Sequence, residues 1–348
     1  MINFIDKIPF IIAEISANHN GSLNHAIKLI NMAKNFGANA IKLQTYTPDM
    51  MTLKDNKIKF KISKGLWKGY NLWDLYNLGQ TPQEWHKILF KHAHKRKIKI
   101  FSTPFSEEAV KFLDRLNCQA FKISSFEMND YNLIKVAAKT KKPLILSTGL
   151  SSMDEIEKAV SIARSNGCRD LTLLYCVSNY PSKFSEFNLN YIKEFKKKFK
   201  CRVGLSDHSI GSEIANYSLI SGATVFEKHI ALQNQKKGLD LNFSLRGKEL
   251  GAYVRNLHET YKLIENKKFI RSKSELSNKI FRRSVYAIKK IKRGEVFSKN
   301  NIRTFRPAKG ISAAYYLNLI NKKSPINLKK NYPLPKTILR KISNRKIK

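Results

Sequence analysis

Short runs of apolar residues alternate with amphipathic stretches along most of the chain. Apolar runs of this kind, each followed by a helical pattern, are typical of parallel strands that are buried on both faces. We expect eight such strands, at Phe10–Ile15, Ala40–Leu43, Ile98–Ser102, Ala120–Ile123, Pro143–Ser147, Leu171–Cys176, Arg202–Leu205 and Thr224–Glu227. Helical patterns lie between them, as at Leu23–Phe36, Glu84–Lys95, Glu107–Leu116, Met153–Asn166 and Gly211–Ser221. This alternation predicts an α/β fold, the (β/α)8 or TIM barrel.

One long segment interrupts the alternation. It runs from Tyr46 to Gln80, directly after the second expected strand, and contains Trp67 and Trp73. A connection of this length that follows a barrel strand is more often a functional lid than a simple linker.

The character of the sequence changes near residue 265. The residues that follow are polar and charged, and beyond them short strand patterns return at Ser284–Ile288 and Asn300–Phe305, with a turn at Lys292–Gly294. A segment of this size is marginal as an independent core. We therefore expect three parts: a barrel domain over 1–265, a linker over 266–280 and a small C-terminal domain over 281–348.

The charge balance of the chain is strongly basic. Its 348 residues include 65 Lys and Arg against 26 Asp and Glu, which gives a formal net charge of +39. Such a charge is typical of proteins that bind nucleic acids. Here, however, the basic residues are spread along the chain, and their clusters lack interleaved aromatic residues. We interpret the charge as a solvated surface that attracts anionic substrates, and expect no specific nucleic-acid partner. A nucleic-acid-binding protein on a barrel scaffold is the alternative.

The sequence also bears on location. It has no run of about 18 apolar residues that would span a membrane, and its first apolar run stops at Glu14, too short for the core of a signal peptide. The four cysteines show neither CxxC spacing nor a disulfide framework. We expect a cytoplasmic protein without membrane association.

Candidate chemistry lies at the C-terminal ends of the expected strands, where barrel enzymes place their active groups. Lys42 and Gln44 share one face of the second strand, and Lys122 lies in the fourth. A lysine inside an apolar strand is rarely buried without an anionic partner, so two of them predict a ligand with phosphate or carboxylate groups. Pairing of each lysine with a neighbouring glutamate is the alternative. Hydroxyl groups suited to the same ligand follow several strands, at Ser125, Ser147, Ser178 and Ser206.

Two histidines, His208 and His229, follow adjacent strands. Their imidazole rings should therefore meet at the mouth of the barrel. Two histidines with open coordination positions suit a divalent ion such as Mn²⁺ that receives a substrate oxygen. Simple hydrogen bonding is the alternative, and it is our interpretation of the other histidines.

The motifs at these strand ends resemble, in order, those of the sialic acid synthase family. They are Ala13–Gly21, Ile41–Thr45, Phe121–Glu127, Leu146–Gly149, Ser206–His208 and Glu227–His229. The C-terminal motifs Arg282–Ser284, Lys292–Glu295 and Arg306–Pro307 resemble the antifreeze-like (SAF) domain of that family. Within the family, Tyr46–Asp49, Gly65–Trp67 and Phe126 resemble the pseudaminic acid synthase branch.

The resemblance implies a transferase that forms a C–C bond. Phosphoenolpyruvate and water would react with the open-chain aldehyde of an acetamido sugar, giving a nonulosonic acid and phosphate. In the pseudaminic acid branch the sugar is 2,4-diacetamido-2,4,6-trideoxy-β-L-altropyranose. The N-acetylneuraminate or legionaminate branch, which uses a sugar of the N-acetylmannosamine type, is the alternative.

The resemblance also implies roles for individual residues. Glu127 would be a catalytic acid/base. His208 and His229 would hold the catalytic metal, with Mn²⁺ expected and Mg²⁺ or Co²⁺ as alternatives. The small domain would cap the barrel of the partner in a domain-swapped homodimer. The residues implied to bind phosphoenolpyruvate are Lys42, Lys122, Ser125, Ser147, Ser178 and Ser206, and those implied to contact the sugar are Gln44, Tyr180, Asp240 and Arg306.

Overall fold

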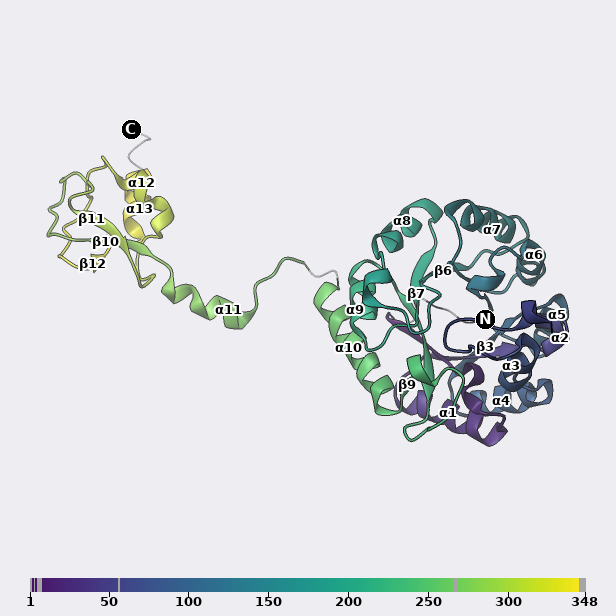
Figure 1. Cartoon of the computed structure of the whole chain (residues 1–348). Coiled ribbons are helices and arrows are strands. Elements are labelled where there is room, and N and C mark those ends of the chain that lie inside the picture. The colour runs from purple at the N-terminus through teal and green to yellow at the C-terminus, as the bar shows by residue number, and fades with distance from the viewer. Residues whose placement is uncertain (1, 3, 5–7, 56, 266–267, 344–348) are drawn as a thin grey trace. The chain divides into compact units, whose positions relative to one another are not determined.

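The computed structural model of the chain describes residues 2, 4, 8–55, 57–265 and 268–343 (Figure 1). These residues form two compact units, divided after Glu265. Two positions of the expected linker, 266 and 267, and the last five residues of the expected small domain lie outside the described residues.

The first unit is a closed barrel of eight parallel strands, which confirms the expected (β/α)8 fold. Each strand pairs with the next along the chain, and β1 also pairs with β8. The strands are β1 (Phe10–Glu14), β2 (Ala40–Thr45), β3 (Lys99–Pro104), β4 (Phe121–Ile123), β5 (Leu144–Ser147), β6 (Leu171–Cys176), β7 (Arg202–Asp207) and β8 (Val225–Ala231). A short strand, β9 (Leu245–Arg246), pairs with the end of β8. The strand β8 therefore runs past its expected end at Glu227 and includes His229.

Helices surround this ring of strands, as Figure 1 shows. They are α1 (Leu23–Asn35), α4 (Gln83–Lys95), α5 (Glu107–Arg115), α6 (Tyr131–Lys139), α7 (Met153–Ser165), α8 (Asn190–Phe199), α9 (Glu213–Ile220) and α10 (Lys248–Ile264). Helix α7 shows why these segments are helical. Ser152 and Glu155 form a capping box at its start, and its buried residues recur at helical spacing, from Ile156 to Ala163. The strands are apolar throughout because the barrel interior covers one face and the helices cover the other.

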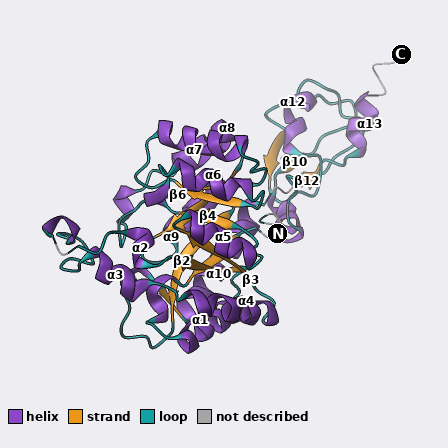
Figure 2. Ribbon diagram, turned by 90° about the vertical axis from the view of Figure 1, so that its right-hand side faces the viewer, coloured by secondary structure: helices purple, strands orange, loops and turns teal. Residues whose placement is uncertain are grey.

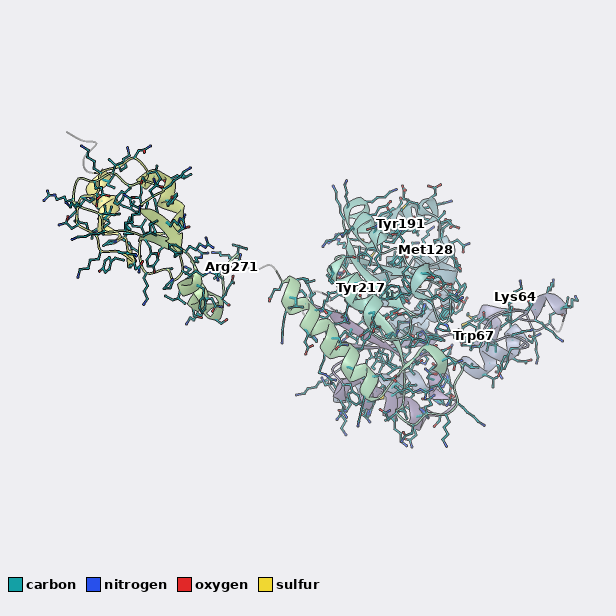
Figure 3. The ribbon with its side chains drawn as sticks, turned by 60° about the vertical axis from the view of Figure 1, so that its left-hand side comes forward. Lys64, Trp67, Met128, Tyr191, Tyr217 and Arg271 are labelled. Atoms are coloured by element: carbon teal, nitrogen blue, oxygen red, sulfur yellow. The ribbon has the colours of Figure 1, made fainter. Side chains whose placement is uncertain are left out.

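The segment expected as a lid, residues 46–80, contains the short helices α2 (Pro48–Met51) and α3 (Leu72–Gly79) and a 3-10 turn at Ile58–Phe60. Figure 2 shows it projecting from the barrel. In Figure 3, Lys64 lies at its outer end and Trp67 lies closer to the barrel.

The second unit has its own apolar core around a three-stranded antiparallel sheet. The sheet has the order β11 (Ile302–Phe305), β10 (Ser284–Ala287), β12 (Tyr332–Pro333). The helices α11 (Lys273–Ser277), α12 (Tyr316–Leu319) and α13 (Thr337–Ser343) complete the unit. Its core includes Val285, Phe297, Ile302 and Leu334. The two expected strands are confirmed, and β12 adds a strand that the pattern did not predict.

The second unit also carries much of the charge. Residues 266–348 contain 25 Lys and Arg but only two Glu and no Asp. Basic residues thus occur along the whole chain, as expected, but more than half of the net charge belongs to this unit, because it has so few acidic residues.

Among the described residues, no helix is long and apolar enough to cross a membrane.

Candidate active site

A pocket of about 260 Å³ lies at the C-terminal ends of the barrel strands. The barrel topology explains its position, because parallel strands bring the residues that end them to one rim. The pocket brings together most of the residues singled out from the sequence: Lys42, Gln44, Lys122, Ser125, Glu127, Tyr180, Ser206, His208, His229 and Asp240. Ser147, Ser178 and Arg306 are not among the residues that line it.

Two lysines and one glutamate, Glu227, line the floor of the pocket, and a second glutamate, Glu14, contacts Lys42 without lining the pocket. Lys122 Nζ lies 2.5 Å from Glu227 Oε1, and Lys42 Nζ contacts the Glu14 carboxylate and lies 3.7 Å from Glu227 Oε1. All four side chains are almost completely buried. Each lysine thus has the glutamate partner that was the alternative from the sequence, so its burial does not by itself require a bound anion. That the two lysines bind an anionic ligand stays a prediction.

The two glutamates differ in their electrostatics. Burial alone would raise the pKa of Glu227, but Lys122 and Lys42 outweigh burial and hold that pKa below its usual range. For Glu14 burial prevails, and its pKa is raised in spite of Lys42. Neither glutamate was assigned a role from the sequence. The signal for one was present, because each is an acidic residue near the end of an otherwise apolar strand.

Hydroxyl groups gather around Gly149, at the start of the loop that follows β5. The Gly149 N–H donates to Ser125 Oγ over 3.1 Å. A Cβ atom at this glycine would lie 2.8 Å from Ser125 Oγ and closer still to Ser178 Oγ, so only glycine leaves room for both. Ser147, on β5, is buried, and its Oγ has no hydrogen-bond partner among the described residues. These groups form a cradle of donors beside Lys122.

Glu127 lies at the end of the 3-10 turn Ser125–Glu127 that follows β4. Its Oε2 accepts a hydrogen bond from Ser124 Oγ. Burial raises the pKa of Glu127, and the Ser124 bond opposes that rise only in part. The carboxyl group therefore keeps its proton to a higher pH than a solvated glutamate does, which suits an acid/base role.

The two histidines lie side by side, with ring centroids 5.6 Å apart. His208 Nδ1 donates to the Val177 carbonyl over 3.1 Å, which leaves its other ring nitrogen outside this bond. His229 Nδ1 is buried without a hydrogen-bond partner among the described residues, 3.7 Å from Asp240 Oδ2. Burial, followed by the neighbouring His208 and lysines, holds the pKa of His229 well below its usual range. A neutral imidazole with a free nitrogen is the form that binds metal ions.

His208 and His229 could bind a metal ion that has few ligands from the protein. Within the described part of the chain, no group of three or more His, Cys, Asp and Glu side chains is arranged to hold a metal. The orphaned nitrogen of His229 nevertheless fits a ligand role. A divalent ion here would have two imidazole ligands and take its other ligands from water or substrate.

The outer wall of the pocket is apolar and comes largely from the lid segment. Trp67 Nε1 donates to the Leu239 carbonyl over 3.0 Å, and the Trp67 ring lies 5.5 Å from that of Tyr180. The Tyr180 ring in turn lies 4.4 Å from His208. Further apolar side chains of this wall are Met51, Ile62, Leu72, Leu75, Tyr76, Phe105 and Phe243. From the sequence, a functional lid was expected in this segment, with Trp67 as a candidate for an apolar wall. The other residues of the wall were not predicted, because they join the pocket only through long-range contacts.

Arg306 belongs to the second unit, where it directly follows β11 and is exposed. The next residue is held firmly, because the Pro307 carbonyl accepts hydrogen bonds from Ser284 Oγ and Tyr286 Oη over 2.9 and 2.8 Å. The loop that presents Arg306 is therefore anchored to β10.

Fold and pocket together define a (β/α)8-barrel enzyme that is followed by a small basic domain. Residues 29–269 match the model of the NeuB family, and residues 282–339 match the model of the SAF domain. The chain belongs to the NeuB family, which confirms the resemblance to sialic acid synthases. This membership supports an enzyme and not the nucleic-acid-binding alternative.

Relatives extend over nearly the whole chain. A pseudaminic acid synthase of Campylobacter jejuni is 43% identical over 93% of this chain and 94% of its own length. An N,N'-diacetyllegionaminic acid synthase of the same species is 37% identical over 93% of this chain and 98% of its own. The crystal structure of an N-acetylneuraminic acid synthetase of Leptospira borgpetersenii, in complex with citrate, matches with a TM-score of 0.69. It is 31% identical and covers 78% of this chain and 90% of its own.

Proposed function

We propose that the chain is a pseudaminic acid synthase. It condenses phosphoenolpyruvate with the open-chain aldehyde of 2,4-diacetamido-2,4,6-trideoxy-β-L-altropyranose and water, and releases pseudaminic acid and phosphate. The greater identity to the pseudaminic acid synthase than to the legionaminic acid synthase supports this branch. The observation that carries the proposal is a single pocket that joins a floor with two lysines, a histidine pair and an apolar wall.

Phosphoenolpyruvate would bind at the floor of the pocket. Lys42 and Lys122 supply positive charge, and the hydroxyl groups of Ser125 and Ser206 supply hydrogen-bond donors for phosphate and carboxylate oxygens. The Gly149 N–H donates to Ser125 Oγ and so orients that hydroxyl. The free Oγ of Ser147 and the Ser178 hydroxyl beside Gly149 would join the same cradle. In this role Glu14 and Glu227 hold the two lysines in place until the anion arrives.

The reaction forms one C–C bond and one C–O bond to water, and it breaks the C–O bond to phosphate. The methylene carbon of phosphoenolpyruvate attacks the aldehyde carbon, whose oxygen takes up a proton, and water adds to the oxocarbenium carbon that results. The water loses a proton, and phosphate leaves with the electrons of the C–O bond. Glu127 is proposed to move these protons, because its raised pKa lets it carry one into the reaction.

His208 and His229 are proposed to hold a divalent ion, with Mn²⁺ as the expected metal and Mg²⁺ or Co²⁺ as alternatives. When bound, such an ion supplies a Lewis acid for the aldehyde oxygen. The free, neutral imidazole nitrogen of His229 supports this assignment.

The sugar would lie against the outer part of the pocket, near Gln44, Tyr180 and Asp240. The proposed sugar has a methyl group at C6 and two acetamido methyl groups. The apolar wall, which includes Trp67 and Phe243, suits these methyl groups. N-Acetylmannosamine carries a hydroxyl at C6 and would leave that hydroxyl without a polar partner against such a wall.

The test is an assay of phosphate release from phosphoenolpyruvate with Mn²⁺ and each candidate sugar. We expect kcat/KM to be greatest with the 2,4-diacetamido altrose. A greater kcat/KM with N-acetylmannosamine or with the legionaminate precursor would contradict the proposed branch while leaving the family assignment intact. No phosphate release with any of the three sugars would contradict the proposed function.

We also propose that the chain works as a domain-swapped homodimer in the cytoplasm, with functional parts at 1–265, 266–280 and 281–348. In such a dimer Arg306 would contact the sugar in the partner's pocket. The described residues from 268 to 283 support an intermolecular role, because all are exposed and they include Phe269, Ile270 and Phe281. An exposed apolar segment of this kind commonly contacts another chain.

A further inference from the structure

A further buried ion pair lies beside the histidine pair, on the other face of the same two strands. Lys228 Nζ lies 3.1 Å from Asp207 Oδ2, and both side chains are completely inaccessible. The two residues are opposite each other in the register of β7 and β8. Each directly precedes one of the histidines, His208 and His229.

The pair has no access to the substrates. Along each strand the side chains alternate, so Ser206 and His208, and likewise Glu227 and His229, line the pocket, while Asp207 and Lys228 face the helices. The Asp207 carboxylate accepts a hydrogen bond from Tyr253 Oη of α10 over 3.3 Å. Any effect of Asp207 or Lys228 on the chemistry therefore acts through another residue.

The hydrogen bonds of the pair fix the backbone around His208. Asp207 Oδ1 accepts bonds from Ser209 N and Ser209 Oγ over 2.9 and 2.6 Å, so it bridges His208 from the residue before to the residue after. Lys228 Nζ donates to the Ser209 carbonyl, which ties the same turn to β8 one residue before His229. Three residues thus lock two strand ends together.

Stability alone does not account for a buried ion pair. Removing two charges from water costs so much that an apolar pair of similar volume is often as stable or more stable. What such a pair does provide is a unique register, because a slip by one residue would separate the charges and turn each histidine away from the pocket.

We propose that Asp207 and Lys228 are positioning residues, which set the register of β7 and β8 so that His208 and His229 present their rings together as metal ligands. The inference rests on the metal site of the proposed function. The arrangement resembles a support shell behind metal ligands, whose loss typically lowers metal affinity about 10- to 100-fold.

The test compares two double variants. In Asp207→Leu/Lys228→Met the ion pair behind the histidines becomes apolar. The control, Asp170→Leu/Arg202→Met, removes the ion pair that joins Asp170 to Arg202 at the opposite end of β7. The measurements are the affinity for Mn²⁺ alone, by EPR titration of metal-free protein without substrate, the free energy of unfolding, and kcat and KM for phosphoenolpyruvate.

We expect the first variant to fold, to bind Mn²⁺ at least tenfold more weakly and to lose kcat by a similar factor. Its KM for phosphoenolpyruvate should change less than the Mn²⁺ affinity, because Lys42 and Lys122, the proposed cations for this substrate, lie on other strands and only Ser206 of the proposed donors lies on β7. The control should keep the wild-type affinity for Mn²⁺. Wild-type Mn²⁺ affinity and kcat in the first variant would overturn the inference.

A milder variant decides the matter if the first one fails to fold. Asp207→Asn/Lys228→Gln replaces both charges by polar groups of similar size, and unchanged Mn²⁺ affinity in it would overturn the inference. A wild-type chain that binds Mn²⁺ without turning over phosphoenolpyruvate would contradict the proposed function and leave this inference standing. Absence of Mn²⁺ binding by the wild type would overturn the inference.

Discussion

Lys122 Nζ and Glu227 Oε1 lie 2.5 Å apart at the floor of the barrel pocket, and both side chains are almost completely buried. The contact links β4 to β8, two strands that are not neighbours in the ring. It therefore crosses the inside of the barrel. An ion pair in this place has two roles. Each buried charge compensates the other, and the lysine is held where an anionic substrate would bind.

Single and double variants separate these two roles. Lys122→Met leaves Glu227 without its main partner, and the free energy of unfolding should fall by about 3 kcal/mol, the lower end of the usual range because Lys42 is close. Lys122→Met/Glu227→Gln should recover most of that stability, since no uncompensated charge remains. Turnover should stay lost in both, because a cation for phosphoenolpyruvate is missing. Urea denaturation and phosphate release measure the two effects, and a double variant with restored turnover would show that Lys122 does not bind the substrate.

Trp67 should decide how well the sugar binds. Trp67→Ala removes an apolar surface of the pocket wall and the hydrogen bond to the Leu239 carbonyl. We expect kcat/KM for the diacetamido sugar to fall by about 10- to 200-fold, while KM for phosphoenolpyruvate stays close to the wild-type value. Trp73→Ala is the matched control, because Trp73 belongs to the same lid segment but does not line the pocket. Equal losses in the two variants would point to a general loosening of the lid and not to a sugar contact.

The buried His86 makes the stability depend on pH. Its Nδ1 donates to the Pro82 carbonyl and its Nε2 contacts Thr45 Oγ1 over 2.7 Å. Burial lowers the pKa of His86 from 6.5 to about 4. Because the unfolded chain binds the proton more readily, this histidine contributes stability above pH 6.5 that is lost as the pH falls toward 4. Between pH 7 and pH 5 its share of the loss should be about 2 kcal/mol.

Urea denaturation at these two pH values checks the expectation. The His86→Gln variant should lose less stability between pH 7 and pH 5 than the wild type does. The variant His94→Gln, at an exposed position of the same helix, should keep the wild-type difference. If His86→Gln retained the full wild-type difference, the protonation of His86 would not be its cause.

Metal removal should silence the enzyme. Incubation with a chelator followed by gel filtration is expected to abolish phosphate release, and Mn²⁺ should restore it. His208→Ala and His229→Ala should lose activity with a wild-type far-UV circular dichroism spectrum, while His94→Ala should remain active. Full activity of a rigorously chelated wild type would refute the metal role of the two histidines.

Mixed dimers should reveal where Arg306 acts. Glu127→Ala and Arg306→Ala are each expected to be inactive, and the two variants are dissociated, mixed and reassociated. If each small domain serves the partner's barrel, random pairing gives one intact site in each mixed dimer and restores about a quarter of the wild-type sites. Subunit exchange is verified by mass spectrometry of differently tagged chains. Exchange without recovered activity would place Arg306 at its own barrel or remove it from the site.

The barrel and much of the pocket could be predicted from the sequence, because both depend on patterns within short stretches of neighbouring residues. Strands buried on both faces are apolar throughout, so their ends are marked by the first polar residues, and parallel strands bring those ends to one rim. This is why Lys42, Lys122, His208 and His229 could be expected in one place. Their roles in substrate and metal binding remain predictions.

Features that depend on distant partners were beyond the sequence pattern. The pattern ended β8 at Glu227 because Lys228 is charged, yet the strand continues because Asp207 neutralises that lysine. The orientation of Trp67 likewise depends on the Leu239 carbonyl, which lies far along the chain. In both cases the stabilising partner comes from another element, and a window of neighbouring residues does not contain it.

The seam between the first and last strands of the barrel has a consequence for how the protein becomes active. Glu14 on β1 is paired in register with His229 on β8, and Lys42 reaches carboxylates from both strands. Almost the whole barrel must therefore be synthesised before these residues can come together. Until then a nascent chain has neither the histidine pair nor the ion pairs of Lys42 and Lys122. Activity should therefore appear only late in synthesis, and incomplete chains should not turn over phosphoenolpyruvate.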